Sequence, residues 1–141
     1  MSAKHSIYGI PCLVQSPKLR EAIRFVLNQI RTHAPEDFKR IQRRVIRFGD
    51  RNSASGWKKQ TMARFLNFSG TGVIEFSKKI RPEDLKLSVA HELGHACGRP
   101  RDVRKRHGQH EFIADDYSHK WGFGRIILPF EGQLRRSEKE T

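Results

Sequence analysis

The chain has few cysteines, no long apolar run and few acidic residues. Its 141 residues include two cysteines, Cys12 and Cys97, whose wide separation fits reduced, partly buried thiols better than a disulfide framework. No run of about 18 apolar residues occurs, which argues against a membrane span. The first ten residues lack the hydrophobic region of a signal peptide. We therefore expect a folded cytoplasmic protein.

Basic side chains outnumber acidic ones. The chain carries 28 Lys and Arg against 15 Asp and Glu, which gives a net charge of +13. Such an excess attracts polyanions, so nucleic acid, an acidic protein or an anionic surface are candidate partners, with an ordinary solvated surface as the alternative. Two basic pairs, Lys39-Arg40 and Arg43-Arg44, lie in a short helix predicted over 35–43 and give it a basic outer face.

The spacing of apolar residues predicts one α+β domain over residues 1–141, with loose ends at about 1–6 and 132–141. A supporting helix is expected from Pro17 to His33, with Ser16 as its N-cap. A small, mostly antiparallel sheet packs on this helix. Its predicted strands are 44–48, 61–68 and 72–77, the last two joined as a hairpin.

The stretch from Arg81 to Gly98 is the most informative part of the chain. Pro82 suits the first position of a helix, and Gly98 suits its end. Between them, His91-Glu92-Leu93-Gly94-His95 places two imidazoles on one helix face, one turn apart, with a carboxylate beside them. Two imidazoles so placed can bind one metal ion, and Glu92 can act on a water there. The alternative is an ordinary amphipathic helix that carries two histidines.

A catalytic zinc ion takes three protein ligands, so the two histidines need a third. Glu111 is the favoured candidate because it lies on the next predicted helix, 109–121. Asp115, four residues later on the same face, is placed to hydrogen-bond a ligating histidine. The alternatives are a third histidine, His107 or His110, and a direct aspartate ligand, Asp115 or Asp116.

Three segments together resemble the compact gluzincin metallopeptidases of the ImmA/IrrE-like kind. They are Gly70–Phe76, Leu87–His95 and Glu111–Asp115. The resemblance implies a zincin-like fold, in which a strand precedes the H-E-x-x-H helix and a glutamate on the following helix completes the zinc site. Weaker similarity links His95–Gly98 to antirestriction-protein metallopeptidases and His107–Phe112 to SprT-like proteases, and both relatives are associated with nucleic acid.

This resemblance implies a zinc metallopeptidase that hydrolyses peptide bonds of a protein or peptide substrate. In that reaction His91, His95 and Glu111 hold the zinc ion, while Glu92 takes a proton from the attacking water and later delivers it to the leaving amine. The strand at 72–77 is either an open edge that pairs with an extended peptide or an ordinary internal strand.

The reaction also needs a hydrogen-bond donor for the oxyanion, and the chain has an alternative function to consider. Tyr117 and His119 are candidate donors for the oxyanion, although structural roles are favoured for both. The alternative function is a basic nucleic-acid-binding module whose zinc site is structural or inactive. Structural zinc sites favour cysteine, and the chain has no Cys-x-x-Cys motif, which argues against that form of the alternative.

Overall fold

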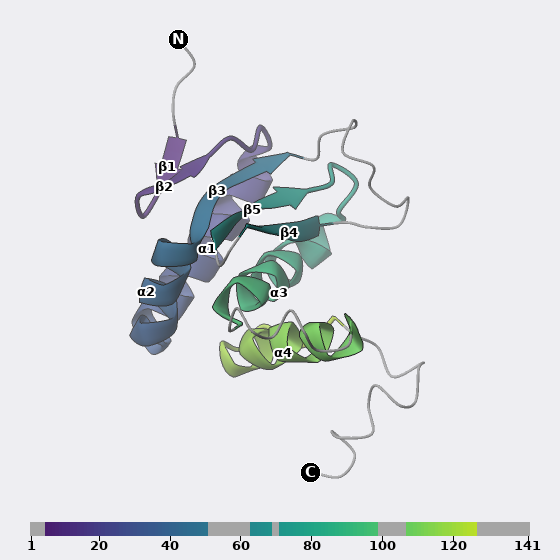
Figure 1. Cartoon of the computed structure of the whole chain (residues 1–141). Coiled ribbons are helices and arrows are strands. Elements are labelled where there is room, and N and C mark those ends of the chain that lie inside the picture. The colour runs from purple at the N-terminus through teal and green to yellow at the C-terminus, as the bar shows by residue number, and fades with distance from the viewer. Residues whose placement is uncertain (1–4, 51–62, 69–70, 99–106, 127–141) are drawn as a thin grey trace.

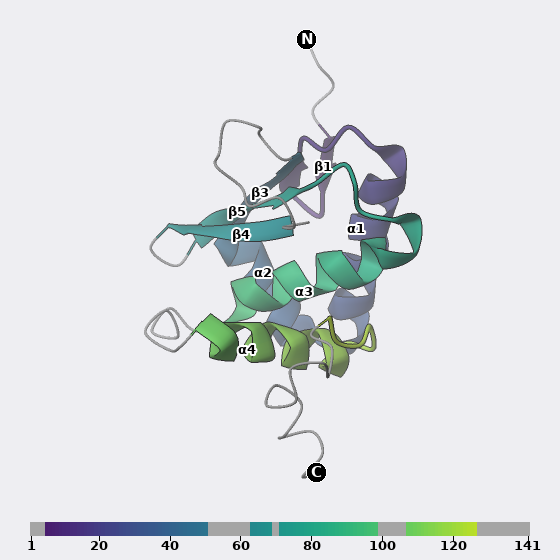
Figure 2. The same ribbon diagram turned by 90° about the vertical axis from the view of Figure 1, so that its right-hand side faces the viewer.

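The computed structural model describes residues 5–50, 63–68, 71–98 and 107–126. Within these ranges the chain is an α+β structure, with one sheet lying against helices (Figure 1). Both views place α3 (Leu85–Cys97) between the sheet and α4 (His107–Lys120) (Figure 2). The other elements are β1 (His5–Ile7), β2 (Ile10–Cys12), α1 (Pro17–His33), α2 (Pro35–Arg44), β3 (Val45–Asp50), β4 (Ala63–Phe68), β5 (Thr71–Phe76) and the short 3-10 helix η2 (Pro82–Asp84).

The sheet is mixed, and the prediction of a mostly antiparallel sheet is wrong. Its strand order in the described residues is β1-β2-β3-β5-β4. The outer pairs β1–β2 and β4–β5 are antiparallel, whereas β2–β3 and β3–β5 are parallel. The predicted hairpin of β4 and β5 is present, but it docks on β3 through its second strand. β5 is therefore internal, and β4 has a described neighbour on one side only.

The first strand pair was not predicted from the sequence. β1 and β2 are three residues each, too short to show alternation, and they are joined by Tyr8 and Gly9 with φ of 52° and 84°. Two central residues with positive φ are typical of a type I′ hairpin turn. His5 and Ser6, placed in a predicted loose end, belong to β1, whereas residues 1–4 and 132–141 lie outside the described residues.

The supporting helix forms as predicted. The Ser16 hydroxyl accepts a hydrogen bond from the Leu19 amide at 3.2 Å, and Pro17 occupies the first turn. One stripe of α1 is buried in the core. It consists of Leu19, Ala22, Ile23, Val26, Leu27 and Ile30. No helix in the described ranges is long and apolar enough to cross a membrane.

Side chains of α2 form hydrogen bonds with the C-terminal ends of α3 and α4. The buried Asp37 carboxylate accepts hydrogen bonds from Lys120 Nζ at 2.8 Å and Trp121 Nε1 at 2.9 Å, at the end of α4. Arg40 donates to the Cys97 carbonyl oxygen at 3.4 Å, and Arg44 donates to the carbonyl oxygens of Ala96, at 3.1 Å, and Gly98. The pairs Lys39-Arg40 and Arg43-Arg44 were predicted to face solvent. The second residue of each pair instead donates hydrogen bonds to carbonyl groups at the end of α3.

α3 and α4 approach each other closely at one glycine. A Cβ atom at Gly94 would lie 2.4 Å from the carbonyl oxygen and 2.9 Å from the Cα atom of Ala114. Since the obstructing atoms belong to backbone, no side-chain rotation can make room. A residue without a Cβ is therefore required where α3 crosses α4.

Gly94→Ala is expected to destabilise the fold by about 1–3 kcal/mol, because α4 would have to move away from α3. Gly49→Ala is the matched control, since a Cβ at Gly49 meets no atom within 4 Å. Urea unfolding followed by circular dichroism measures both variants. Equal stability of the two would contradict the close contact.

Candidate metal site

The two histidines of α3 lie together at a largely buried face. His91 is 3% exposed and His95 is half-buried, and their ring centroids are 4.8 Å apart in an edge-to-face arrangement. α3 is buried on most of its circumference because the sheet, α1, α2 and α4 all pack on it. The predicted helix is confirmed: η2 leads into α3, and the helix ends before Gly98.

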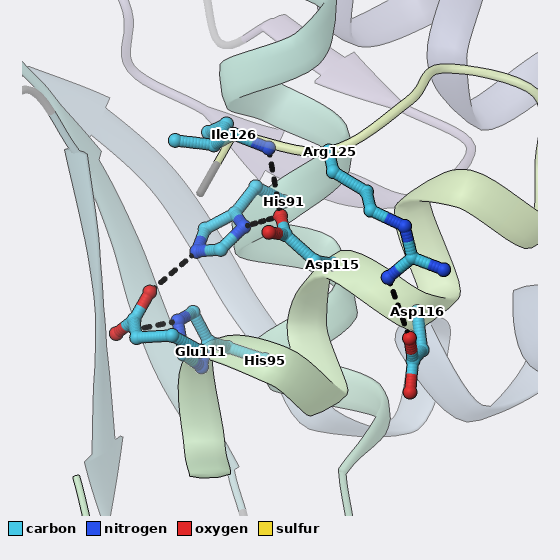
Figure 3. Close-up of polar contacts among 7 residues, drawn as sticks. All are labelled: His91, His95, Glu111, Asp115, Asp116, Arg125 and Ile126. Carbon is cyan, nitrogen blue, oxygen red and sulfur yellow. Dashed lines mark hydrogen bonds and ion pairs between the residues drawn. The ribbon is translucent and has the colours of Figure 1, made fainter. Parts of the chain in front are cut away.

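Glu111 extends from α4 toward both imidazoles (Figure 3). Its Oε1 atom lies 2.8 Å from His91 Nε2, and its Oε2 atom lies 3.4 Å from His95 Nε2. The Nε2 atoms of two histidines and one carboxylate thus converge on the same place. The structure brings together the three side chains for which the sequence predicted ligand roles, and those roles stay predictions.

Asp115 holds the opposite side of the His91 ring. The residue is 1% exposed, and its Oδ1 atom accepts a hydrogen bond from His91 Nδ1 at 2.8 Å (Figure 3). A carboxylate acceptor requires a proton on Nδ1, so Nε2 is the nitrogen presented to Glu111. This is the arrangement by which a carboxylate orients a metal-binding histidine.

The cluster shifts the pKa values of its members strongly. Burial lowers the pKa of His91, but the hydrogen bonds with Asp115 and Glu111 outweigh it and raise the pKa to about 10. Burial would raise the pKa of Glu111, and the hydrogen bonds with the two histidines instead hold it well below its ordinary value. In the metal-free protein the site is therefore an imidazolium paired with two carboxylates.

These shifts make the metal-free fold depend on pH in both directions. The pKa of His91 is higher than its ordinary 6.5, so its pairing stabilises the fold fully below about pH 6.5, and this contribution is lost as the pH rises to about 10. The lowered pKa of Glu111 gives stability that is present above its ordinary 4.5 and is lost as the pH falls.

Glu92 is buried at the same face, and one of its two carboxyl oxygens is unpaired among the described residues. It is 6% exposed, and its Oε1 atom has no hydrogen-bond partner among the described residues. Burial raises its pKa, while the charges of His95 and His91 lower it. A buried carboxyl oxygen in this condition fits a site that is completed by a water or an ion.

The donor set fits a metal ion. One ligand atom from each of His91, Glu92 and His95 can be chosen so that all lie within 4.8 Å of one another, and Glu111 contacts both rings as well. Imidazole nitrogens with carboxylate oxygens are donors that zinc and similar transition metals accept. The described residues therefore include a His/Glu cluster of the H-E-x-x-H kind on a helix, able to bind a metal ion.

The other predicted site residues form no hydrogen bond with this cluster in the described part of the chain, or their side chains lie outside it. The Tyr117 hydroxyl accepts a hydrogen bond from Arg40 at 3.2 Å, and His119 is exposed. The tyrosine ring packs on Trp121, directly after the end of the same helix, with centroids 5.6 Å apart. His107 and His110 belong to the first turn of α4, and their side chains lie outside the described residues.

Sequence reasoning missed two features that shape the site. Gly94 carried a signal, because a glycine inside an otherwise good helix often marks a close backbone approach. The Ile126 amide carried none: it donates to Asp115 Oδ1 at 2.9 Å, and a main-chain donor is present at every residue except proline.

Comparison with known proteins identifies no relative of this chain. No protein-family model, no curated protein and no solved structure matches the chain. The likeness to gluzincins therefore rests on the motif and on the spacing of the residues that follow it. What the structure adds is the convergence of those residues at one place.

Uptake of a divalent ion is expected to release about one proton near neutral pH, because His91 is protonated in the metal-free protein and must lose that proton to bind the ion. The affinity should rise about tenfold per pH unit in this range. Calorimetric titration with Zn²⁺ in buffers of different ionisation enthalpy counts the protons. His119→Ala is the control and should leave the count unchanged; binding without proton release would contradict the charged cluster.

Proposed function

We propose that the protein is a zinc-dependent endopeptidase that hydrolyses peptide bonds of a protein or peptide substrate. The observation that supports this most strongly is the Glu111 carboxylate lying against the Nε2 atoms of His91 and His95, at 2.8 and 3.4 Å, with the buried Glu92 next to them. The proposal assigns different roles to the two glutamates, one in holding the ion and one in moving a proton.

The proposed zinc ligands are His91, His95 and Glu111. Two imidazoles and a carboxylate suit zinc better than magnesium or calcium, which prefer oxygen donors, and three protein ligands leave a position for the reaction. A structural site would be expected to add a cysteine. Cys97 does not serve, because its Sγ atom points to the Asp37 carbonyl oxygen at 3.8 Å and burial raises its pKa to about 12.

A zinc ion bound here would supply Lewis-acid chemistry, lowering the pKa of a water and polarising the scissile carbonyl group. Glu92 would take the proton from the attacking water and deliver it to the leaving amine. Its burial and raised pKa suit a carboxyl group that must carry a proton for part of the cycle. Asp115 would keep the His91 ring oriented throughout.

We place the substrate along β4. Among the described residues this strand has a neighbour on one side only, and it packs against α3. An extended peptide added to its other edge would run beside that helix (Figure 2). Main-chain hydrogen bonds would then supply affinity that does not depend on substrate sequence. Tyr117 and His119 stay predictions as oxyanion donors, and the hydrogen bond of Tyr117 with Arg40 favours the structural role for that residue.

The charge of the chain supports a second candidate function. A net charge of +13 fits a nucleic-acid-binding module, in which the metal site would be structural or inactive. The two functions are compatible, since a protease can meet its substrate on nucleic acid. They differ in what removal of the Glu92 carboxylate would abolish.

Glu92→Gln is expected to retain zinc and to reduce peptide hydrolysis about 10²- to 10⁴-fold, because the amide cannot accept and return the proton. Cleavage of a peptide library read by mass spectrometry, with zinc measured in parallel, tests this. Unchanged cleavage would contradict the role of Glu92. If the wild-type protein cleaved nothing, yet bound duplex DNA with a steep salt dependence that survived Glu92→Gln, the second function would replace the first.

Glu111→Ala is expected to lose most of its zinc, because one of three ligands is removed. His107→Ala is the matched variant on the same helix and should retain the metal if Glu111 is the ligand. Zinc per chain, measured after dialysis against a metal buffer, compares them. Retention by Glu111→Ala together with loss in His107→Ala would exchange the two assignments.

A further inference from the structure

The chain turns back along α4 directly after that helix ends. Gly122, with φ of 95°, closes the helix: its amide donates to the His119 carbonyl oxygen, and the Phe123 amide donates to the Ser118 carbonyl oxygen, each at 3.0 Å. This pair of bonds is a Schellman motif. We call the residues from Gly122 to Ile126 the return segment.

Two contacts hold the return segment to neighbouring helices, and a third holds Trp121, the residue before it. Gln29 of α1 donates to the Trp121 carbonyl oxygen at 2.7 Å, just before the turn. The Phe123 ring packs edge-on against Phe25 of α1, with centroids 6.3 Å apart. Beyond it, Arg125 donates to the Asp116 carboxylate of α4 at 2.7 Å (Figure 3). The segment is therefore held to α1 at Phe123 and to α4 at Arg125.

The return segment ends at the metal-site carboxylate. The Ile126 amide donates to Asp115 Oδ1 at 2.9 Å, and the same oxygen atom accepts the bond from His91 Nδ1 at 2.8 Å (Figure 3). The two donors come from different parts of the chain. Together they restrict rotation of the Asp115 carboxylate about its side-chain bonds. Hydrogen bonds to a charged acceptor are the stronger kind, so a main-chain donor can set the carboxylate's position.

We infer that the return segment is a positioning element of the candidate metal site: the Ile126 amide orients Asp115, and Asp115 orients His91 toward the ion. This inference rests on the proposed function, because orienting His91 matters for a metal site only if His91 binds a metal. Ile126 is a positioning residue that acts through its backbone, and its side chain is not required.

Ile126→Pro against Ile126→Ala tests the inference. Proline lacks the amide hydrogen, whereas alanine keeps it and removes most of the side chain. Zn²⁺ affinity, measured by competition with a chelating dye, should fall about 10- to 100-fold in Ile126→Pro and stay close to wild type in Ile126→Ala. In an Asp115→Ala background the proline substitution should cause no further loss, since its effect passes through that carboxylate.

A second measurement does not depend on the proline variant folding. Amide hydrogen exchange of the metal-free wild-type protein, followed residue by residue by NMR, should show Ile126 protected, and Asp115→Ala should remove that protection. An unprotected Ile126 amide, or equal zinc affinity of a folded Ile126→Pro protein and wild type, would overturn the inference alone. Failure of the wild-type protein to take up Zn²⁺ would overturn the proposed function and this inference with it.

Discussion

The close approach of α4 to α3 is the constraint on which the candidate site depends. Ala114, whose backbone lies against Gly94, stands between Glu111 and Asp115 in α4. One carboxylate on each side of this contact can therefore reach a different nitrogen of the same imidazole, His91, and Glu111 reaches His95 as well. A larger separation of the helices would take both carboxylates from the ring together.

Helical periodicity carried most of what the sequence predicted correctly. The capped α1, the two histidines of α3 and the pairing of Glu111 with Asp115 on one face of α4 follow from residues three to four positions apart. The order and direction of strands did not follow, because the sheet is set by contacts between segments far apart in the chain. A β4–β5 hairpin can dock on β3 through either strand, and its own residues do not specify which.

Charged groups in the fold illustrate the same limit in another way. From sequence, a pair such as Lys39-Arg40 predicts a solvated surface, and Lys39 is indeed exposed. Arg40, one position later, bonds the end of α3 and the Tyr117 hydroxyl, while Asp37 accepts hydrogen bonds from the end of α4. Whether a guanidinium meets water or a carbonyl oxygen depends on which helix end lies opposite, and that is a property of the assembled fold.

The bond from the return segment to Asp115 has a consequence for how the site could vary among related chains. Because the donor is part of the main chain, nineteen of the twenty amino acids can supply it, and selection on this contact would leave position 126 free to drift in size and polarity. Among related sequences, the only trace of this contact would be that proline does not occur at position 126. A position of this kind is invisible to comparisons that look for an unchanging side chain, although the geometry of the ion's first imidazole would depend on it.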